Sequence, residues 1–271
     1  MLKQIKHPIM IYSDKSGLDM RHYKTRVKSF LKSIVPESIL SYLLKNRRAH
    51  KNAPSPGNVN PGDFKRLIPF DNEFGFNRGR PVDRVYIEQF LSTESRHIKG
   101  RVLEIGDNSY TIRFGGGNVQ KSDILHVDQK NPVATFTGDL SDAPHLPGGA
   151  FDCVILTQTL HLIYEFKDAL RTCKRILKPG GALLLTVPGI TPIDKGEWRN
   201  NWYWSFTEQS IKKLSKEIFN TDLTEIHAYG NVFSATAFLY GMSASELTNE
   251  ELFFIDPQFP VIVTLKVLVN E

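Results

Sequence analysis

The stretch that decides the fold is residues 101–106, RVLEIG, in which a short apolar run ends on an acid and a glycine. A short run rich in Val, Leu and Ile is typical of a strand buried on both faces. Similar runs recur at residues 123–127 (DILHV), 151–157 (FDCVILT) and 182–187 (ALLLTV). Their recurrence predicts a mostly parallel sheet.

Helical segments alternate with these runs. We expect helices over residues 81–91, 166–177, 207–219 (with Thr207 as N-cap) and 232–240. Three more strands complete the pattern, at residues 134–137, 223–227 and 261–269. Such alternation predicts an α/β fold. We expect a doubly wound, mostly parallel seven-stranded sheet with its last strand antiparallel, plus an N-terminal helical extension.

Composition narrows the class of protein. The chain has 271 residues, of which 41% are hydrophobic and 23% charged, as in ordinary soluble domains. It contains no apolar run of about 18 residues, so we expect no transmembrane helix. A secretory signal is not expected either. Two cysteines, Cys153 and Cys173, make neither a disulfide framework nor a zinc site. These features predict a cytoplasmic protein.

Charge divides the chain into parts. Residues 1–51 hold twelve Lys/Arg and three acids, a net charge of +9, whereas the remainder has a net charge of −4. Within this basic extension, residues 23–46 have helical periodicity and could contact an anionic membrane peripherally, or pack on their own domain or a second subunit. Residues 52–63 (NAPSPGNVNPGD) read as a linker, and 64–271 as the main domain.

The ends of the predicted strands carry the first site residues. Glu104 and Gly106 close the first strand, Asp128 follows the second, and Asp139 follows the third. In open α/β sheets, ligands bind beyond the carboxyl ends of the strands. Asp128 lies 22 residues after Gly106, close to the spacing expected of a carboxylate that binds ribose hydroxyls. The pattern favours a nucleoside-containing ligand, although Asp also forms turns and caps.

At these residues the sequence resembles the Rossmann-like, S-adenosylmethionine-dependent methyltransferases. The resemblance is carried by Asp128 and by residues 102–106 (VLEIG), 138–139 (GD), 146–147 (LP), 151–156 (FDCVIL), 160–161 (LH) and 177–181 (LKPGG). More narrowly, residues 74–88, 198–207 (WRNNWYWSFT) and 231–241 look like methyltransferases encoded with bacterial surface-polysaccharide and glycosyltransferase genes. One departure is that Asn108 and Tyr110 stand where the family usually has glycines. Asn108 tolerates a left-handed backbone, whereas Tyr110 is harder to accommodate.

The resemblance implies S-adenosyl-L-methionine as cofactor. Gly106 and the adjoining backbone, including Asp107, would face its methionine part, with Glu104 at the ammonium. Asp128 would hold the ribose and Asp139 with Leu140 the adenine. Gln158 and His161 would border the reacting methyl group, and Arg84 with Tyr86 would clasp the cofactor. A dinucleotide fits less well, because the loop lacks the glycine triplet.

The acceptor is predicted to be an alcohol. An alcohol is a poor nucleophile and needs a general base, for which His161 is the first candidate because imidazole titrates near the operating pH. His161 could instead only pack at a helix entry; Asp107, Asp194 and Glu197 are substitutes. No metal-ligand spacing stands out. The loop over residues 193–207 holds Trp198, Arg199, Trp202 and Trp204, whose faces suit a sugar ring, or fill the core under the loop.

The sequence therefore predicts a methyltransferase (EC 2.1.1) for O-methylation in polysaccharide biosynthesis, acting on a sugar or surface glycan without nucleic acid. Two alternatives remain open. One is a lipid or other small-molecule methyltransferase at the inner membrane surface, and the other is a non-catalytic subunit that scaffolds glycan synthesis. A homo-oligomer is compatible with both.

Overall fold

The computed structural model describes residues 53–270. The predicted helix at residues 23–46 lies outside them. The chain divides into two compact units between Gly62 and Asp63. Among the helices of residues 53–270, none is long and apolar enough to cross a membrane.

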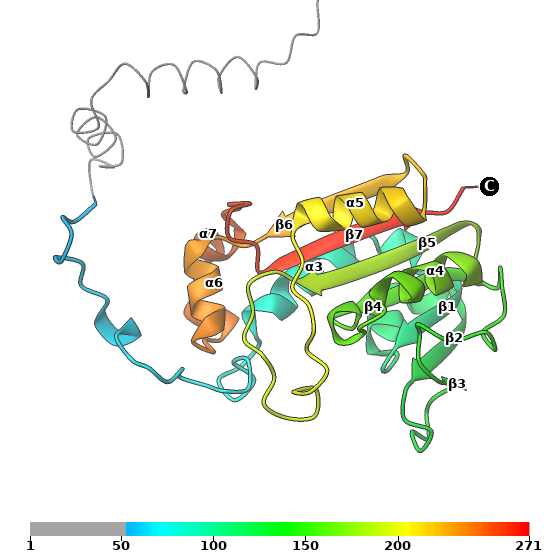
Figure 1. The fold of residues 1–271 in the computed structure, drawn as a ribbon, viewed down its shortest axis with the longest axis horizontal. Coiled ribbons are helices and arrows are strands. Elements are labelled where there is room, and N and C mark those ends of the chain that lie inside the picture. Colours follow the sequence, from blue (N-terminus) through cyan, green and yellow to red (C-terminus); the bar gives the residue numbers. More distant parts are fainter. Residues whose placement is uncertain (1–52, 271) are drawn as a thin grey trace, which may run out of the picture. The chain divides into compact units, whose positions relative to one another are not determined.

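Seven strands form one sheet (Figure 1). They are β1 (Gly100–Ile105), β2 (Val119–His126), β3 (Phe136–Thr137), β4 (Phe151–Thr157), β5 (Leu177–Pro188), β6 (Thr224–Tyr229) and β7 (Ile262–Leu268).

The strand order is β3-β2-β1-β4-β5-β7-β6. Strands β1 to β5 pair in parallel, while β7 runs antiparallel to both β5 and β6. This confirms the predicted doubly wound sheet with an antiparallel last strand. The order reverses between β1 and β4, so their carboxyl ends open a crevice at which ligands bind in such sheets.

Five α-helices cover the sheet. They are α3 (Val82–Thr93), α4 (Phe166–Ile176), α5 (Glu208–Ile218), α6 (Val232–Leu239) and α7 (Asn249–Phe253), joined by the short turns η1 (Gly62–Phe64), η2 (Ser95–His97), η3 (Thr111–Gly115), η4 (Gly116–Asn118), η5 (Leu160–Leu162) and η6 (Ala244–Glu246).

Each face of the sheet has its own core. In β4, Val154 and Leu156 pack among residues of α4 and α5, whereas Cys153 and Ile155 pack toward α3 and α6. Successive side chains of a strand point to opposite faces, so an unbroken apolar run is what burial on both faces requires. Figure 1 shows α4 and α5 in front of the sheet, with α3 behind it.

Local sequence sets the element ends. Thr207 caps α5 as predicted, accepting from the Ser210 amide while the Ser210 hydroxyl reaches back to the Thr207 amide. Residues 178–181 were expected to separate helix and strand, but β5 already begins at Leu177 and its pairing with β4 shifts register there. The third strand is shorter than predicted, covering Phe136–Thr137 only.

Two connections shape the crevice. Between β1 and β2 the chain makes a π-helical turn, η3, instead of a long helix. Single π turns occur often at functional sites. Between β5 and α5, the loop over residues 189–207 extends beyond the end of the sheet, as the yellow segment of Figure 1 shows.

Candidate active site

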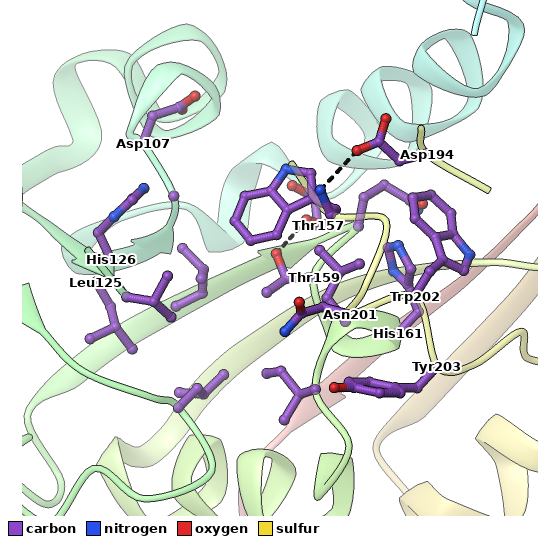
Figure 2. A pocket seen from close by; sticks show the side chains of 18 of the residues that line it. Asp107, Leu125, His126, Thr157, Thr159, His161, Asp194, Asn201, Trp202 and Tyr203 are labelled. Atoms are coloured by element: carbon purple, nitrogen blue, oxygen red, sulfur yellow. Dashed lines mark hydrogen bonds between the residues drawn. The ribbon is translucent and has the colours of Figure 1, made fainter. Parts of the chain in front are cut away.

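A cavity of about 920 Å³ lies at the carboxyl ends of β1 and β4. Figure 2 shows Asp107 and His126 at one end of it and His161, Trp202 and Tyr203 at the other. We refer to the first as the β1 end and to the second as the loop end. The volume is in the range of cavities that enclose whole ligands, about 300–1,000 Å³.

Gly106 forms part of the wall at the β1 end. Its φ is +96°, and a Cβ placed on it would have no other heavy atom within 4 Å. Only glycine adopts such a backbone without strain, so the chain turns there while leaving open space beside it. A ligand can approach this backbone closely.

Glu104, two residues before this glycine, is buried. Its carboxylate accepts hydrogen bonds from the amides of Tyr110 (3.2 Å) and Thr111 (2.7 Å) and from the Thr111 hydroxyl (2.7 Å). The carboxylate therefore fixes the start of η3. Burial raises the pKa of Glu104 to about 7, although the hydrogen bonds from Thr111 and Tyr110 oppose the rise. Glu104 still lines the cavity.

Of the other acids predicted to bind the cofactor, some line the cavity and one does not. Asp107 and Asp139, with Leu140, lie on the wall. Asp128 does not: β2 ends at His126, and the exposed Asp128 carboxylate turns back to accept from the Lys130 amide at 2.8 Å. Asp128 therefore stands off the cavity wall in this structure, because a local turn takes its carboxylate, and its contact with the ribose stays a prediction.

Asn108 and Tyr110, which stand where glycines are usual, are both accommodated without a left-handed backbone. Asn108 does not have a positive φ, contrary to the left-handed backbone expected for it; its side-chain amide donates to Ser122 Oγ at 3.1 Å. Tyr110 joins the first turn leading into η3 and forms part of the cavity wall, where its ring packs near Phe114. The tyrosine narrows the cavity without filling it.

Gln158 follows β4 with a φ of +45°, a conformation that costs free energy for any residue but glycine. Two contacts to Thr186 on β5 hold it there, from its amide to the carbonyl oxygen (3.0 Å) and from its side-chain amide to the hydroxyl (3.2 Å). The turn directs the chain into η5 and so positions His161. Strain held by neighbouring structure is common at functional sites.

His161 is the buried polar group at the loop end. Its side chain is 1% exposed, and within the described part of the chain neither ring nitrogen has a hydrogen-bond partner. The Trp202 ring meets it edge-on, with centroids 4.3 Å apart, and Trp202 in turn stacks on Phe74 at 6.0 Å. Burial, with a smaller effect of the Arg84 charge, lowers the pKa of His161 to about 3. The imidazole is therefore neutral at physiological pH and does not titrate near the operating pH, contrary to the expectation from its ordinary pKa.

The aromatic loop splits between cavity and core. Trp198 and Trp202 line the cavity, and the Trp198 amide is held by Asp194 at 2.9 Å. Trp204 does not: it packs on Phe166, and its indole N–H donates to the carbonyl of Ile163 at 3.2 Å. Arg199 is exposed and off the wall, as is Glu197. Arg199 and Trp204 are thus not on the cavity wall, and their contact with an acceptor stays a prediction.

Arg84 and Tyr86 point to opposite sides of α3. Arg84 lines the cavity beside Asp83, whose charge interacts with its guanidinium. Tyr86 lies in the core, stacked on Tyr229, and its hydroxyl donates to the carbonyl of Leu252 at 2.7 Å. Residues two apart on a helix do not share a face, so only one of this pair could reach the site.

Several cavity residues escaped the sequence argument. They come from segments far apart in the chain: Phe74, Phe76 and Asp83 before the sheet, His126 at the end of β2, Thr159 and Tyr164 after β4, Asn201 and Tyr203 in the loop, and Phe238 in α6. His126 could have been found, because it is the last residue but one of the strand predicted over residues 123–127. Among residues 53–270, no three His, Cys, Asp or Glu side chains come together as a metal site.

Comparison with known families identifies the middle of the chain. Residues 101–185, from β1 into β5, match the family model described as "Methyltransferase domain". The match covers 85 of the 271 residues. It indicates an S-adenosylmethionine-dependent methyltransferase, an enzyme of class EC 2.1.1 that uses S-adenosylmethionine as cofactor.

Several solved structures are similar to this chain. A SAM-dependent methyltransferase from Archaeoglobus fulgidus shares 12% identity over 68% of this chain and 94% of its own (TM-score 0.47). The plantazolicin methyltransferase BamL, in complex with a desmethylPZN analog and SAH, shares 14% over 73% and 88% (0.47). The [4+2]-cyclase SpnF shares 18% over 69% and 81% (0.45). No curated protein sequence gives a significant match.

The β1 end of the methyltransferase cavity suits this cofactor. Gly106 leaves open space where a side chain would intrude, and the neighbouring wall combines the buried apolar Leu140 with carboxylates. A sulfonium ion with an ammonium group needs acids, and an adenosine needs an apolar wall and hydrogen-bond acceptors. Glu104, Asp107 and Asp139 would supply the acids, and Leu140 the apolar contact. These residues fit the group.

Proposed function

We propose that the enzyme transfers the methyl group to a hydroxyl of a sugar or surface glycan, as O-methylation in polysaccharide biosynthesis. The observation that carries the proposal is the buried, unpartnered imidazole of His161 beside Trp202 at the loop end. A buried polar group without a partner costs free energy, so the site is stabilised when a ligand supplies one. An acceptor hydroxyl can donate to the unprotonated ring nitrogen of a neutral imidazole or accept from its N–H.

His161 would act in this site as hydrogen-bond acceptor and then as base. When bound, S-adenosylmethionine supplies an electrophilic methyl group. One ring nitrogen of His161 accepts a hydrogen bond from the hydroxyl group, and this bond orients a lone pair of the hydroxyl oxygen. As the oxygen gains its bond to carbon, its proton becomes strongly acidic. An imidazole with a pKa of about 3 is then basic enough to take that proton, and it returns the proton to solvent afterwards.

The walls of the loop end supply the remaining requirements. Trp198 and Trp202 offer flat faces to the C–H faces of a sugar ring, and Asn201 offers an amide for hydroxyl groups. Enclosure by the loop over residues 189–207 excludes water, which would otherwise compete as acceptor. Contact of residues 23–46 with a membrane or another partner remains a prediction that concerns residues outside those described.

The test replaces His161 by Phe, which keeps the ring volume against Trp202 but removes both nitrogens. We expect turnover with a hydroxyl acceptor to fall by about 10²–10⁴-fold, the usual contribution of general-base catalysis. Affinity for S-adenosylmethionine should stay unchanged. The wild-type pH–rate profile should show no inflection near 6.5 from His161, because its pKa is about 3. Wild-type turnover by the Phe variant would remove His161 as base.

A further inference from the structure

The cavity wall carries an excess of negative charge. Among the described residues that line it are seven carboxylates but only one Lys or Arg, which is Arg84. Arg84 interacts with the adjacent Asp83, so these two largely balance each other. Glu104, Asp107 and Asp139 belong to the β1 end, where the cofactor brings its own positive charges. Three acids remain, Glu73, Glu165 and Asp194.

These three acids lie around the loop end. Asp194 is drawn there in Figure 2, and it holds the Trp198 amide. Glu165 is the residue just before α4, and Glu73 precedes Phe74, whose ring stacks on Trp202. None of the three forms a salt bridge with another described residue. Their charge is thus available to a ligand.

The opening of the cavity at the loop end, which we call the rim, also exposes aromatic faces. Tyr164 is 61% exposed, Phe76 55% and Tyr203 44%, and all three line the cavity. The Tyr164 and Tyr203 rings meet edge-on with centroids 5.4 Å apart. Aromatic faces attract cations through their negative quadrupole, and the attraction adds to that of nearby carboxylates. An anionic acceptor would meet repulsion from the acids, and the described residues that line the cavity offer it no Lys or Arg besides Arg84.

A second observation places a ligand here independently of the charge. His161 is 1% exposed, lines the same end and has neither nitrogen partnered within the described residues. Together these features define a pocket with a buried hydrogen-bonding floor and an acidic, aromatic mouth. We infer that the acceptor carries a positively charged amino group, bound at this mouth by Glu73, Glu165 and the aromatic rim while its hydroxyl reaches His161. This inference rests on the proposed function for the position of the hydroxyl.

The experiment titrates the full chain, in complex with S-adenosylhomocysteine, with three sugars of one skeleton: glucosamine, glucose and glucuronate. The pH is kept where the amine is protonated. We expect glucosamine to bind about tenfold more tightly than glucose and glucuronate to bind most weakly, because partly exposed charge pairs contribute on this scale. The preference should shrink as salt is added, since salt screens exposed charges. Equal affinities, tighter binding of glucuronate, or no detectable binding of glucosamine would overturn the inference.

Variants locate the effect. Glu73→Gln combined with Glu165→Gln should bring glucosamine affinity down to that of glucose and leave glucose affinity unchanged. Glu197→Gln is the matched control, since this exposed acid of the loop over residues 189–207 is off the wall. An unchanged preference in the double variant would contradict the assignment.

The product separates this inference from the proposed function. A methyl group found on the nitrogen of glucosamine, or no product despite the binding preference, would refute hydroxyl methylation and leave the cation site standing. O-methylation without any preference for the amine would support hydroxyl methylation and refute the cation site.

Discussion

Glu104 makes the stability of the free protein depend on pH in an unusual direction. Its carboxyl group has a pKa of about 7 in the folded chain because it is buried, against an ordinary value of 4.5. The folded state therefore holds this proton more tightly than the unfolded state. Stability is fully present below about pH 4.5 and is lost as the pH rises through about 7. At about 1.4 kcal/mol per pKa unit, the difference corresponds to at most about 3 kcal/mol.

The assay compares thermal unfolding of the ligand-free wild type with Glu104→Gln between pH 5 and pH 8. For a domain of this size, about 3 kcal/mol corresponds to a change in Tm of about 6–12 °C. The Gln variant keeps the shape and an oxygen acceptor for the Thr111 amide but cannot ionise. Other titrating groups contribute equally to both proteins, so the difference between the two slopes isolates Glu104. Identical slopes would refute the argument that burial dominates its hydrogen bonds.

Three further predictions follow from the positions of single residues. Gly106→Ala should weaken S-adenosylmethionine binding about tenfold or more in a calorimetric titration, because a φ of +96° strains any other residue by about 1–3 kcal/mol and the Cβ enters the open wall; an unchanged affinity would show that the ligand does not approach this backbone. Asp128→Ala should change that affinity by less than about twofold while Asp139→Ala lowers it, since only Asp139 lines the cavity; a larger loss in the first variant would mean that residues 127–133 rearrange on binding. Tyr86→Phe should cost about 1 kcal/mol of unfolding free energy, measured by urea denaturation, by removing the hydrogen bond to Leu252, and should leave cofactor affinity unchanged; weakened binding would return Tyr86 to the site.

The fold was accessible to sequence reasoning because burial on both faces leaves a direct imprint. Runs such as residues 151–157 have to be apolar throughout when α4 and α5 cover one face and α3 and α6 the other. The glycine and acids at strand ends follow from the same logic. They mark the edge at which parallel strands stop, so Gly106 and Asp139 could be placed near one another before the structure was known.

The remainder of the site depends on contacts that a linear pattern does not encode. Trp202 and Trp204 differ by two positions in an irregular loop, yet one stacks on Phe74 and the other packs on Phe166. Which indole faces the cavity is decided by those partners, and Phe74 lies far away in the sequence. Asp128 stands off the cavity wall for a local reason, since a turn to the Lys130 amide competes for its carboxylate. The low pKa of His161 also could not be foreseen, because it results from burial beneath this loop.

A crystal structure of the protein with S-adenosylhomocysteine tests most directly whether the loop end of the cavity is the acceptor site. The account predicts the amino-acid portion beside Gly106, the adenine near Asp139 and Leu140, and the sulfur atom facing the loop end with His161 and Trp202. A ligand whose sulfur faces away from His161, or one bound outside this cavity, would contradict the assignment of the loop end as the acceptor site.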